Sequence, residues 1–176
     1  MSGGPAAVGD ESARDRDAQA FGLEGLRHAY ERHEAAQHQR DLRGAYISGV
    51  EGVWWVCALD EELGGNMKQA NDYKSARDAD PNGLVVLGLR WLRNRHTHEL
   101  PLTAAFDDTA FFGSGRGIIA LSKGFYWRPS DDIDPQRIHM IRRHAYDVHV
   151  AGNSSGKTLV VALRWLEQAQ EHRTSR

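Results

Sequence analysis

The densest group of side chains that could do chemistry lies in residues 90–98, where three arginines and two histidines occur within nine positions. Arginine binds phosphate through a planar guanidinium group that stays charged at physiological pH. Histidine has an ordinary pKa of about 6.5, so it can take up or release a proton near neutral pH. Together these residue types supply a phosphate-binding group and a proton shuttle, which are sufficient to cleave RNA without a metal ion.

Within this group, Arg93, Asn94 and His98 follow the order Arg-Asn-x-x-x-His. Asn94 and His98 are four positions apart, so on a helix they share one face, where the amide can orient the imidazole. Looser arginine-to-histidine spacings recur along the chain, but only here does asparagine directly follow the arginine. Arg93, Asn94 and His98 are therefore the candidate catalytic residues. The other basic side chains of the group are candidates for binding the substrate: Arg90, Arg95 and His96.

This pattern, at the end of an apolar helix, resembles the active-site signature of the HEPN superfamily, the mostly helical domains of prokaryotic and eukaryotic RNases. The resemblance implies a helical bundle with the motif on a late helix. It implies that His98 acts as general base or acid at a ribose 2′-hydroxyl or the leaving oxygen, while Arg93 stabilises the charged transition state. The expected products are a 2′,3′-cyclic phosphate and a 5′-hydroxyl, formed without a metal ion or another cofactor.

The same resemblance implies RNA as the substrate and a homodimer whose two motifs face each other across one groove. A role in defence or stress, including toxin activity, follows from the family. In toxin members a tyrosine that is modified by the partner often follows the histidine, whereas Glu99, Leu100 and Pro101 follow here. This difference argues against that form of regulation.

Two alternatives remain beside the endoribonuclease. Family members without catalysis serve as binding modules, so the chain could be a non-catalytic helical module that binds RNA or a protein. A protein partner would dock on the aromatic segment 111–127. The chain could also be a purely structural bundle, because cationic residues at a helix C-terminus are stabilised by the helix dipole without any chemistry.

The elements that must position this group are predicted to be helices. Apolar residues recur at spacings of three and four over residues 17–42, 45–63, 81–100, 135–151 and 155–173. Asp80 followed by Pro81, and Asp134 followed by Pro135, are typical helix starts. Residues 66–79 are polar and indicate a loop or a short helix. The predicted fold class is all-α, an antiparallel bundle of about five helices with an irregular or β-hairpin insert at about residues 105–130.

The periodicity also predicts which faces are buried. In the second helix the apolar face comprises Tyr46, Val50, Val53, Trp54 and Cys57. In the fourth helix it comprises Ile138, Ile141, Ala145 and Val148.

Composition limits the domain organisation and the class of protein. The 176 residues, 40% of them hydrophobic, predict one helical domain over residues 19–173 after a disordered tail at 1–18. The net charge of −2 excludes a bulk polycation, so any RNA contact depends on a local patch. A membrane-spanning segment needs about 18 apolar residues, and none is present. Without a secretory signal at the N-terminus, a cytoplasmic location is expected.

Three other patterns have structural explanations. Residues 152–158 resemble a phosphate-binding loop but are one residue too short, so they predict a turn between helices with a serine cap. Histidines at positions 28, 33 and 38 are spaced by about 140° on a helix and do not share a face, so they give little support for a metal site. The acidic clusters 60–62 and 131–134 are predicted to be solvated surface, and the single cysteine, Cys57, to be a buried thiol.

Overall fold

The computed structural model describes residues 8–65, 70–99, 104–107, 111–112, 119–120, 124–134 and 140–174 of the chain. These residues form an all-α fold, as predicted, with helices α1 (Val8–His38), α2 (Leu42–Gly65), α3 (Ala70–Ala79), α4 (Pro81–Glu99), α5 (Ser130–Ile133), α6 (Met140–His149) and α7 (Ser155–Thr174). The described part of the chain thus has seven helices where five were predicted, and the short helices α3 and α5 account for the difference.

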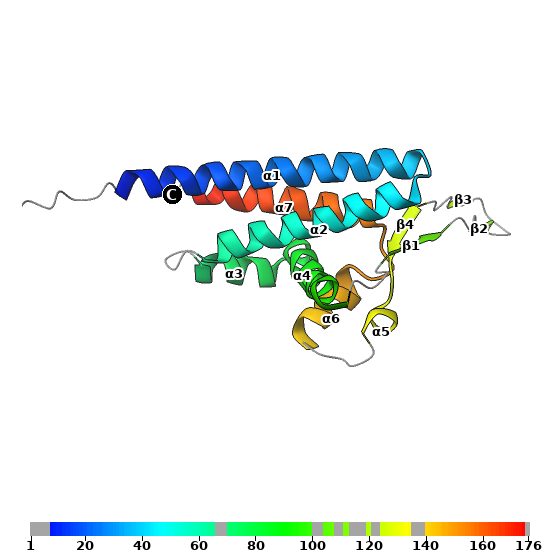
Figure 1. Ribbon diagram of the computed structural model, residues 1–176. Helices are drawn as coiled ribbons and strands as arrows, with labels where there is room; N and C mark the ends of the chain where they lie inside the picture. The colour runs from blue at the N-terminus through cyan, green and yellow to red at the C-terminus, as the bar shows by residue number, and fades with distance from the viewer. Residues whose placement is uncertain are drawn as a thin grey trace, which may run out of the picture.

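The helices form two groups with different directions. α1 runs antiparallel to α2 and α7, and these three helices lie side by side along the length of the molecule (Figure 1). α4 crosses this group, packing on α2 and on α6 (Figure 1). The antiparallel packing expected from the sequence therefore holds between α1 and each of its neighbours, α2 and α7, whereas α4 lies across them.

The insert between α4 and α5 contains the predicted β-hairpin structure. Strand β1 (Ala104–Asp107) pairs antiparallel with β4 (Gly124–Trp127), and β2 (Phe111–Phe112) pairs antiparallel with β3 (Ile119–Ala120). The Trp127 indole in β4 donates a 2.5 Å hydrogen bond to the Thr158 hydroxyl of α7. Phe125 and Trp127 are buried. These two aromatic residues belong to the core, so they are not part of an exposed docking surface as the sequence suggested.

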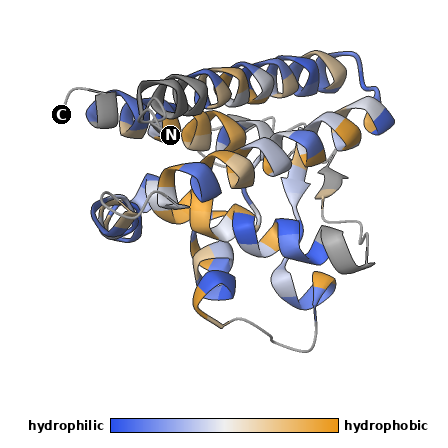
Figure 2. Ribbon diagram, turned by 60° about the vertical axis from the view of Figure 1, so that its left-hand side comes forward, coloured by the Kyte–Doolittle hydropathy of each residue, from blue (hydrophilic) through white to orange (hydrophobic). Residues whose placement is uncertain are grey.

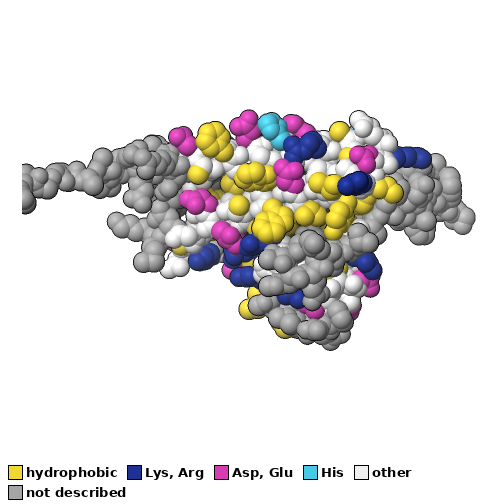
Figure 3. All heavy atoms as spheres, in the orientation of Figure 1, with side chains coloured by type: hydrophobic (Ala, Val, Ile, Leu, Met, Phe, Trp, Pro, Cys, Tyr) yellow, Lys and Arg dark blue, Asp and Glu magenta, His cyan; other side chains and the backbone are white. Residues whose placement is uncertain are grey.

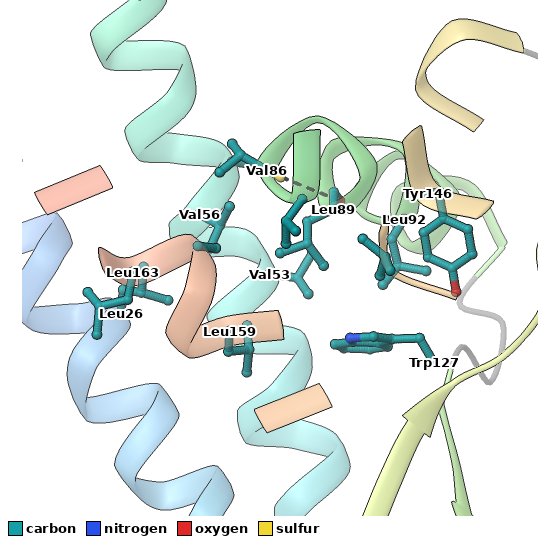
Figure 4. Packing of buried hydrophobic residues seen from close by; sticks show 14 of the residues in the cluster. Leu26, Val53, Val56, Val86, Leu89, Leu92, Trp127, Tyr146, Leu159 and Leu163 are labelled. Atoms are coloured by element: carbon teal, nitrogen blue, oxygen red, sulfur yellow. Dashed lines mark hydrogen bonds between the residues drawn. The ribbon is translucent and has the colours of Figure 1, made fainter. Parts of the chain in front are cut away.

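The core lies where α2, α4 and α7 meet (Figure 4). It is lined by apolar side chains from α1, α2, α4, α5, α6 and α7 and from strands β1 and β4, among them Leu26, Val53, Val56, Val86, Leu89, Leu92, Trp127, Tyr146, Leu159 and Leu163. Each side chain of this size contributes about 1.5–3 kcal/mol when it is fully buried. This packing anchors α4 through Val85, Val86, Leu89, Trp91 and Leu92.

The face of α2 that is buried differs from the predicted one. Val53 and Cys57 are buried as predicted, but Trp54 is 45% exposed and Val50 is only half-buried. The core side of α2 carries glycines among its branched apolar residues, and a Cβ on Gly52 would lie 3.0 Å from Leu159 of α7. Glycine permits this close approach of helices, and Trp54 lies on the outer side of α2.

The prediction of which face of α6 is buried is also mostly wrong. Ala145 is buried, but Ile141 and Val148 are exposed, and Ile138 lies outside the described residues. α6 instead buries Tyr146 and Arg143, whose polar ends reach backbone carbonyls. The Tyr146 hydroxyl donates to the carbonyl of Arg128 at 2.6 Å, and Arg143 donates to that of Asp134 at 2.6 Å. Satisfied hydrogen bonds make burial of these polar groups possible.

The ends of several helices follow the predicted signals. Asp80 accepts a 2.7 Å hydrogen bond from the backbone nitrogen of Asn82, which caps α4 before Pro81. α1 begins at Val8, so the part of the predicted tail that the structure describes is helical. The turn between α1 and α2 contains Arg40, with φ at 57°.

No helix among the described residues is both long enough and apolar enough to cross a lipid bilayer.

The crossing of α4 and α6 depends on Gly88. A Cβ at this position would lie 2.9 Å from the Cα of Tyr146 and 2.8 Å from the side chain of Val150. We expect Gly88→Ala to lower the free energy of unfolding by about 1–3 kcal/mol, because backbone must move to accept the methyl group. Urea unfolding measures this loss. Gly65→Ala is the control, since nothing lies within 4 Å of its Cβ, and an equal loss in both variants would contradict the prediction.

Candidate functional site

The candidate residues lie on the last turns of α4, beyond its apolar half. α4 changes from hydrophobic to hydrophilic along its length (Figure 2). Its backbone is helical to Glu99, which places residues 94 and 98 one turn apart on the same side. Asn94 is half-buried. The side chains of His96 and His98 lie outside the described residues, so the predicted contact between Asn94 and His98 stays a prediction.

A buried carboxylate, Asp60, binds Arg90, the first residue of the group at positions 90–98. Its side chain is fully buried near the end of α2. It accepts hydrogen bonds from the Tyr73 hydroxyl at 2.7 Å and from Nη1 of Arg77 at 2.9 Å, and it forms an ion pair with Arg90. Burial, followed by the charge of Asp60, raises the pKa of Tyr73. The prediction that residues 60–62 are solvated surface is therefore wrong for Asp60.

Arg93 is held on the surface of α2 by two neighbours. Its guanidinium forms an ion pair with Glu61 and lies 5.6 Å from the ring centroid of Trp54. Arg90 also reaches Glu61, at 3.4 Å. The structure thus brings two of the predicted residues, Arg90 and Arg93, together at one end of α2.

Two further arginines, which the sequence did not single out, complete this group. Arg77 comes from α3, and Arg142 comes from the adjoining helix α6. Burial, and then the positive charges of Arg90 and Arg77, lower the pKa of Arg142. We call Arg77, Arg90, Arg93 and Arg142 the arginine cluster. Only three-dimensional packing reveals it, because its members come from three helices.

The ion pairs of the arginine cluster include the carboxylates of Asp60, Glu61 and Asp78. Within the part of the chain that the structure describes, Arg142 forms no ion pair. Arg142, which is half-buried, therefore retains donors suited to an anion such as phosphate.

Arg95 does not join this cluster. Its Nη1 lies 2.9 Å from Oδ2 of Asp134, and both side chains are nearly buried. Asp134 was predicted to be solvated, and its burial is a second correction. The pair ties α4 to the segment after α5, and the predicted substrate-binding role of Arg95, with Arg90 and His96, stays a prediction.

Residues 152–154 form the predicted turn between helices, residues 155–158 begin α7, and Ser155 serves the fold. Gly152 has a φ of 72°, and α7 begins at Ser155. The Ser155 hydroxyl lies 2.7 Å from Nε2 of His33 and 3.0 Å from the carbonyl of Phe125. His33 Nδ1 lies 2.7 Å from the carbonyl of Ala45. This buried chain of hydrogen bonds connects α1, α2, β4 and α7.

His33 makes the stability of the protein depend on pH. Burial lowers its pKa below the ordinary 6.5, partly opposed by the bond to Ala45 and the charge of Glu34. The unfolded chain then binds a proton more readily, so we expect the free energy of unfolding to fall as the pH falls below about 6.5. Urea unfolding between pH 7.5 and pH 5 measures this slope.

Uptake of one proton on unfolding changes the free energy of unfolding by at most about 1.4 kcal/mol per pH unit. This is the largest slope that His33 can cause. His33→Asn removes the titrating group, and the pH dependence should become shallower. His28→Asn, at an exposed position of the same helix, is the matched control. A slope that is unchanged by His33→Asn would show that His33 is not its source.

Other reactive groups do not form a site in the described residues. Burial raises the pKa of the Cys57 thiol from 9.0 to about 12, which confirms a buried structural thiol. Among the side chains that the structure describes, no three His, Cys, Asp or Glu residues are grouped so that they could hold a metal ion.

We compared the chain with family models, with curated proteins and with solved structures, and no match was found in any of the three.

Proposed function

We propose that this protein is a metal-independent endoribonuclease of the HEPN type, acting on cytoplasmic RNA in a defence or stress response. His98 acts as the general base or acid, Arg93 stabilises negative charge on the phosphoryl oxygens, and Asn94 orients His98. Two copies of the chain work together, with their motifs facing a shared RNA strand.

The arginine cluster is the observation that carries this proposal. Arg90 and Arg93 share the Glu61 carboxylate directly before the helix turn that contains position 98. The positive charges of both residues also act on Arg142 of α6. Their present partners, Asp60 and Glu61, differ in burial, since Asp60 is fully buried and the Glu61 side chain is 48% exposed. An RNA phosphate would therefore compete with Glu61, rather than with Asp60, for the guanidinium group of Arg93.

The reaction consumes no water in its first step. The 2′-oxygen loses its proton to a base and attacks the adjacent phosphorus, the bond between phosphorus and the 5′-oxygen breaks, and the 5′-oxygen receives a proton. Arg93 binds the equatorial oxygens, which gain charge as the new bond forms.

Incubation of the purified protein with RNA in EDTA tests this proposal. We expect fragments with 2′,3′-cyclic phosphate and 5′-hydroxyl ends. A DNA of the same sequence should stay intact because it has no 2′-hydroxyl. Intact RNA under these conditions would reject the endoribonuclease.

A non-catalytic RNA-binding module is the second candidate. It needs only the basic side chains of the arginine cluster for phosphate contacts, and not the proton transfer assigned to His98. Such a module would bind RNA without cleaving it, and its affinity would fall steeply with added salt as counterion release diminishes.

A further inference from the structure

An exposed tryptophan lies beside Arg93. Trp54 stands on the outer side of α2 and is 45% exposed, whereas Trp91, Trp127 and Trp165 are buried. The guanidinium group of Arg93 lies 5.6 Å from the centroid of the Trp54 ring. An indole ring has two faces, and the exposed fraction shows that the contact with Arg93 leaves much of this ring open. Trp54 is therefore accessible to a ligand that also reaches Arg93.

The side chain that now pairs with Arg93 is itself exposed. Trp54 and Glu61 stand on the same side of α2, about two helix turns apart, and Arg93 of α4 reaches both. The Glu61 carboxylate also serves Arg90, at 3.4 Å, and its side chain is 48% exposed. Ion pairs of an exposed carboxylate contribute little to stability. An incoming phosphate can therefore replace Glu61 at Arg93, while the ring of Trp54 stays beside the guanidinium group.

The surroundings of Trp54 have the character of an interaction surface. Apolar side chains follow α2 in a band across the face of the molecule, and Ile47 in the same helix is 55% exposed (Figure 3). Contiguous exposed apolar side chains of this kind mark interaction surfaces. A flat apolar ring beside a guanidinium group matches the two parts of a nucleotide, because bases stack on aromatic side chains and arginine binds phosphate.

We infer that Trp54 forms a nucleobase subsite, in which the base of a nucleotide at the cleaved bond stacks on the indole while Arg93 binds the phosphate. The inference rests on the proposed function, which assigns Arg93 to that phosphate. The backbone of α4 continues from Arg93 to position 98 over about 7.5 Å, so the stacked base lies next to the reacting bond. Trp54 thereby selects a nucleotide whose base is unstacked from its neighbours.

Equilibrium binding to the full-length chain of an RNA that cannot be cleaved tests this subsite. The probe is a short single-stranded RNA with 2′-O-methyl ribose, and its counterpart carries abasic nucleotides on the same backbone. We expect Trp54→Leu to weaken binding of the RNA by about fivefold or more, the lower end of the range for stacking of one base. Trp54→Tyr keeps an aromatic ring and should retain most of the affinity. Both variants should bind the abasic strand as the unmodified protein does.

Three outcomes of this experiment would overturn the subsite. The first is equal binding of the RNA by Trp54→Leu and by the unmodified protein. The second is an equal loss for the abasic strand, which would show that Trp54 acts by holding Arg93 and not by contacting a base. The third is no binding of RNA by the unmodified protein, which would leave the exposed side of α2 to a protein partner. Circular dichroism melting confirms that each variant is folded.

Tryptophan fluorescence provides a second readout of the same contact. A stacked base quenches the indole, so the RNA should quench the unmodified protein but not Trp54→Leu. Trp55→Phe is the matched control, because Trp55 is the neighbouring residue and is half-buried, with its indole nitrogen directed to Glu51 at 3.4 Å. Quenching should persist in Trp55→Phe. Quenching that persists in Trp54→Leu would place the base elsewhere and overturn the subsite.

Binding and cleavage, measured separately, distinguish the subsite from the proposed function. Binding that depends on Trp54, without cleavage of unmodified RNA, would refute only the ribonuclease. Cleavage of unmodified RNA, together with binding that Trp54→Leu leaves unchanged, would refute only the subsite.

Discussion

Replacing His98 by alanine is expected to reduce RNA cleavage in EDTA by about 10²–10⁴-fold, the range that a positioned general acid or base contributes. Arg93→Lys is expected to cause a large loss as well, although it keeps the positive charge. Lysine cannot reproduce the bidentate contact of a guanidinium group with two phosphoryl oxygens. The measurement is the initial rate of cleavage of an end-labelled RNA at saturating and limiting concentrations.

The controls for this prediction are matched in residue type. His28→Ala removes an exposed histidine of α1, and Arg27→Ala removes an arginine that pairs with Glu167 on the surface. Both variants should cleave RNA at the rate of the unmodified protein. If His98→Ala and His28→Ala cleave at the same rate, the activity does not come from this motif.

Asp60→Ala is expected to cause the largest loss of stability, about 3–5 kcal/mol, which is the usual cost of removing one partner of a buried ion pair. The substitution leaves Arg77, whose side chain is only 8% exposed, without its buried carboxylate. It also removes the acceptor of the Tyr73 hydroxyl and a partner of Arg90. α2, α3 and α4 lose their common contact.

Urea unfolding followed by circular dichroism measures this loss. Glu62→Ala, two positions along the same helix, is the control, because Glu62 is exposed and surface substitutions usually change stability by about 0.5 kcal/mol or less. A similar small effect of Asp60→Ala would mean that Arg77 and Arg90 find other acceptors at no cost.

Helix positions were predictable from the sequence because the signals are local. Asp80 and Pro81 start α4 through a capping hydrogen bond and a preset φ, and neither depends on distant residues. The same applies to the end of α2 at Gly65 and to the beginning of α7 at Ser155.

Buried faces were less predictable because the partner helix decides them. A periodic pattern assigns bulky apolar residues such as Trp54 to the core, whereas Trp54 is exposed in the structure. Glycines of α2 face α1 and α7 and allow these helices to approach closely. The acidic run at residues 60–62 likewise contains one buried residue, Asp60, among exposed ones. Only its partners on α3 and α4 make that burial possible.

The sequence alone determined the all-α class, and it predicted the end of α4 as the place of the candidate site, with Arg93, Asn94 and His98 as its members. These follow from local helix geometry and from residue types within six positions. The tertiary structure decided which charges meet. It joined Arg77 and Arg90 through the shared carboxylate of Asp60, and it directed Arg95 to Asp134. Such contacts join residues far apart in the chain, and their energies depend on burial, which no local pattern contains.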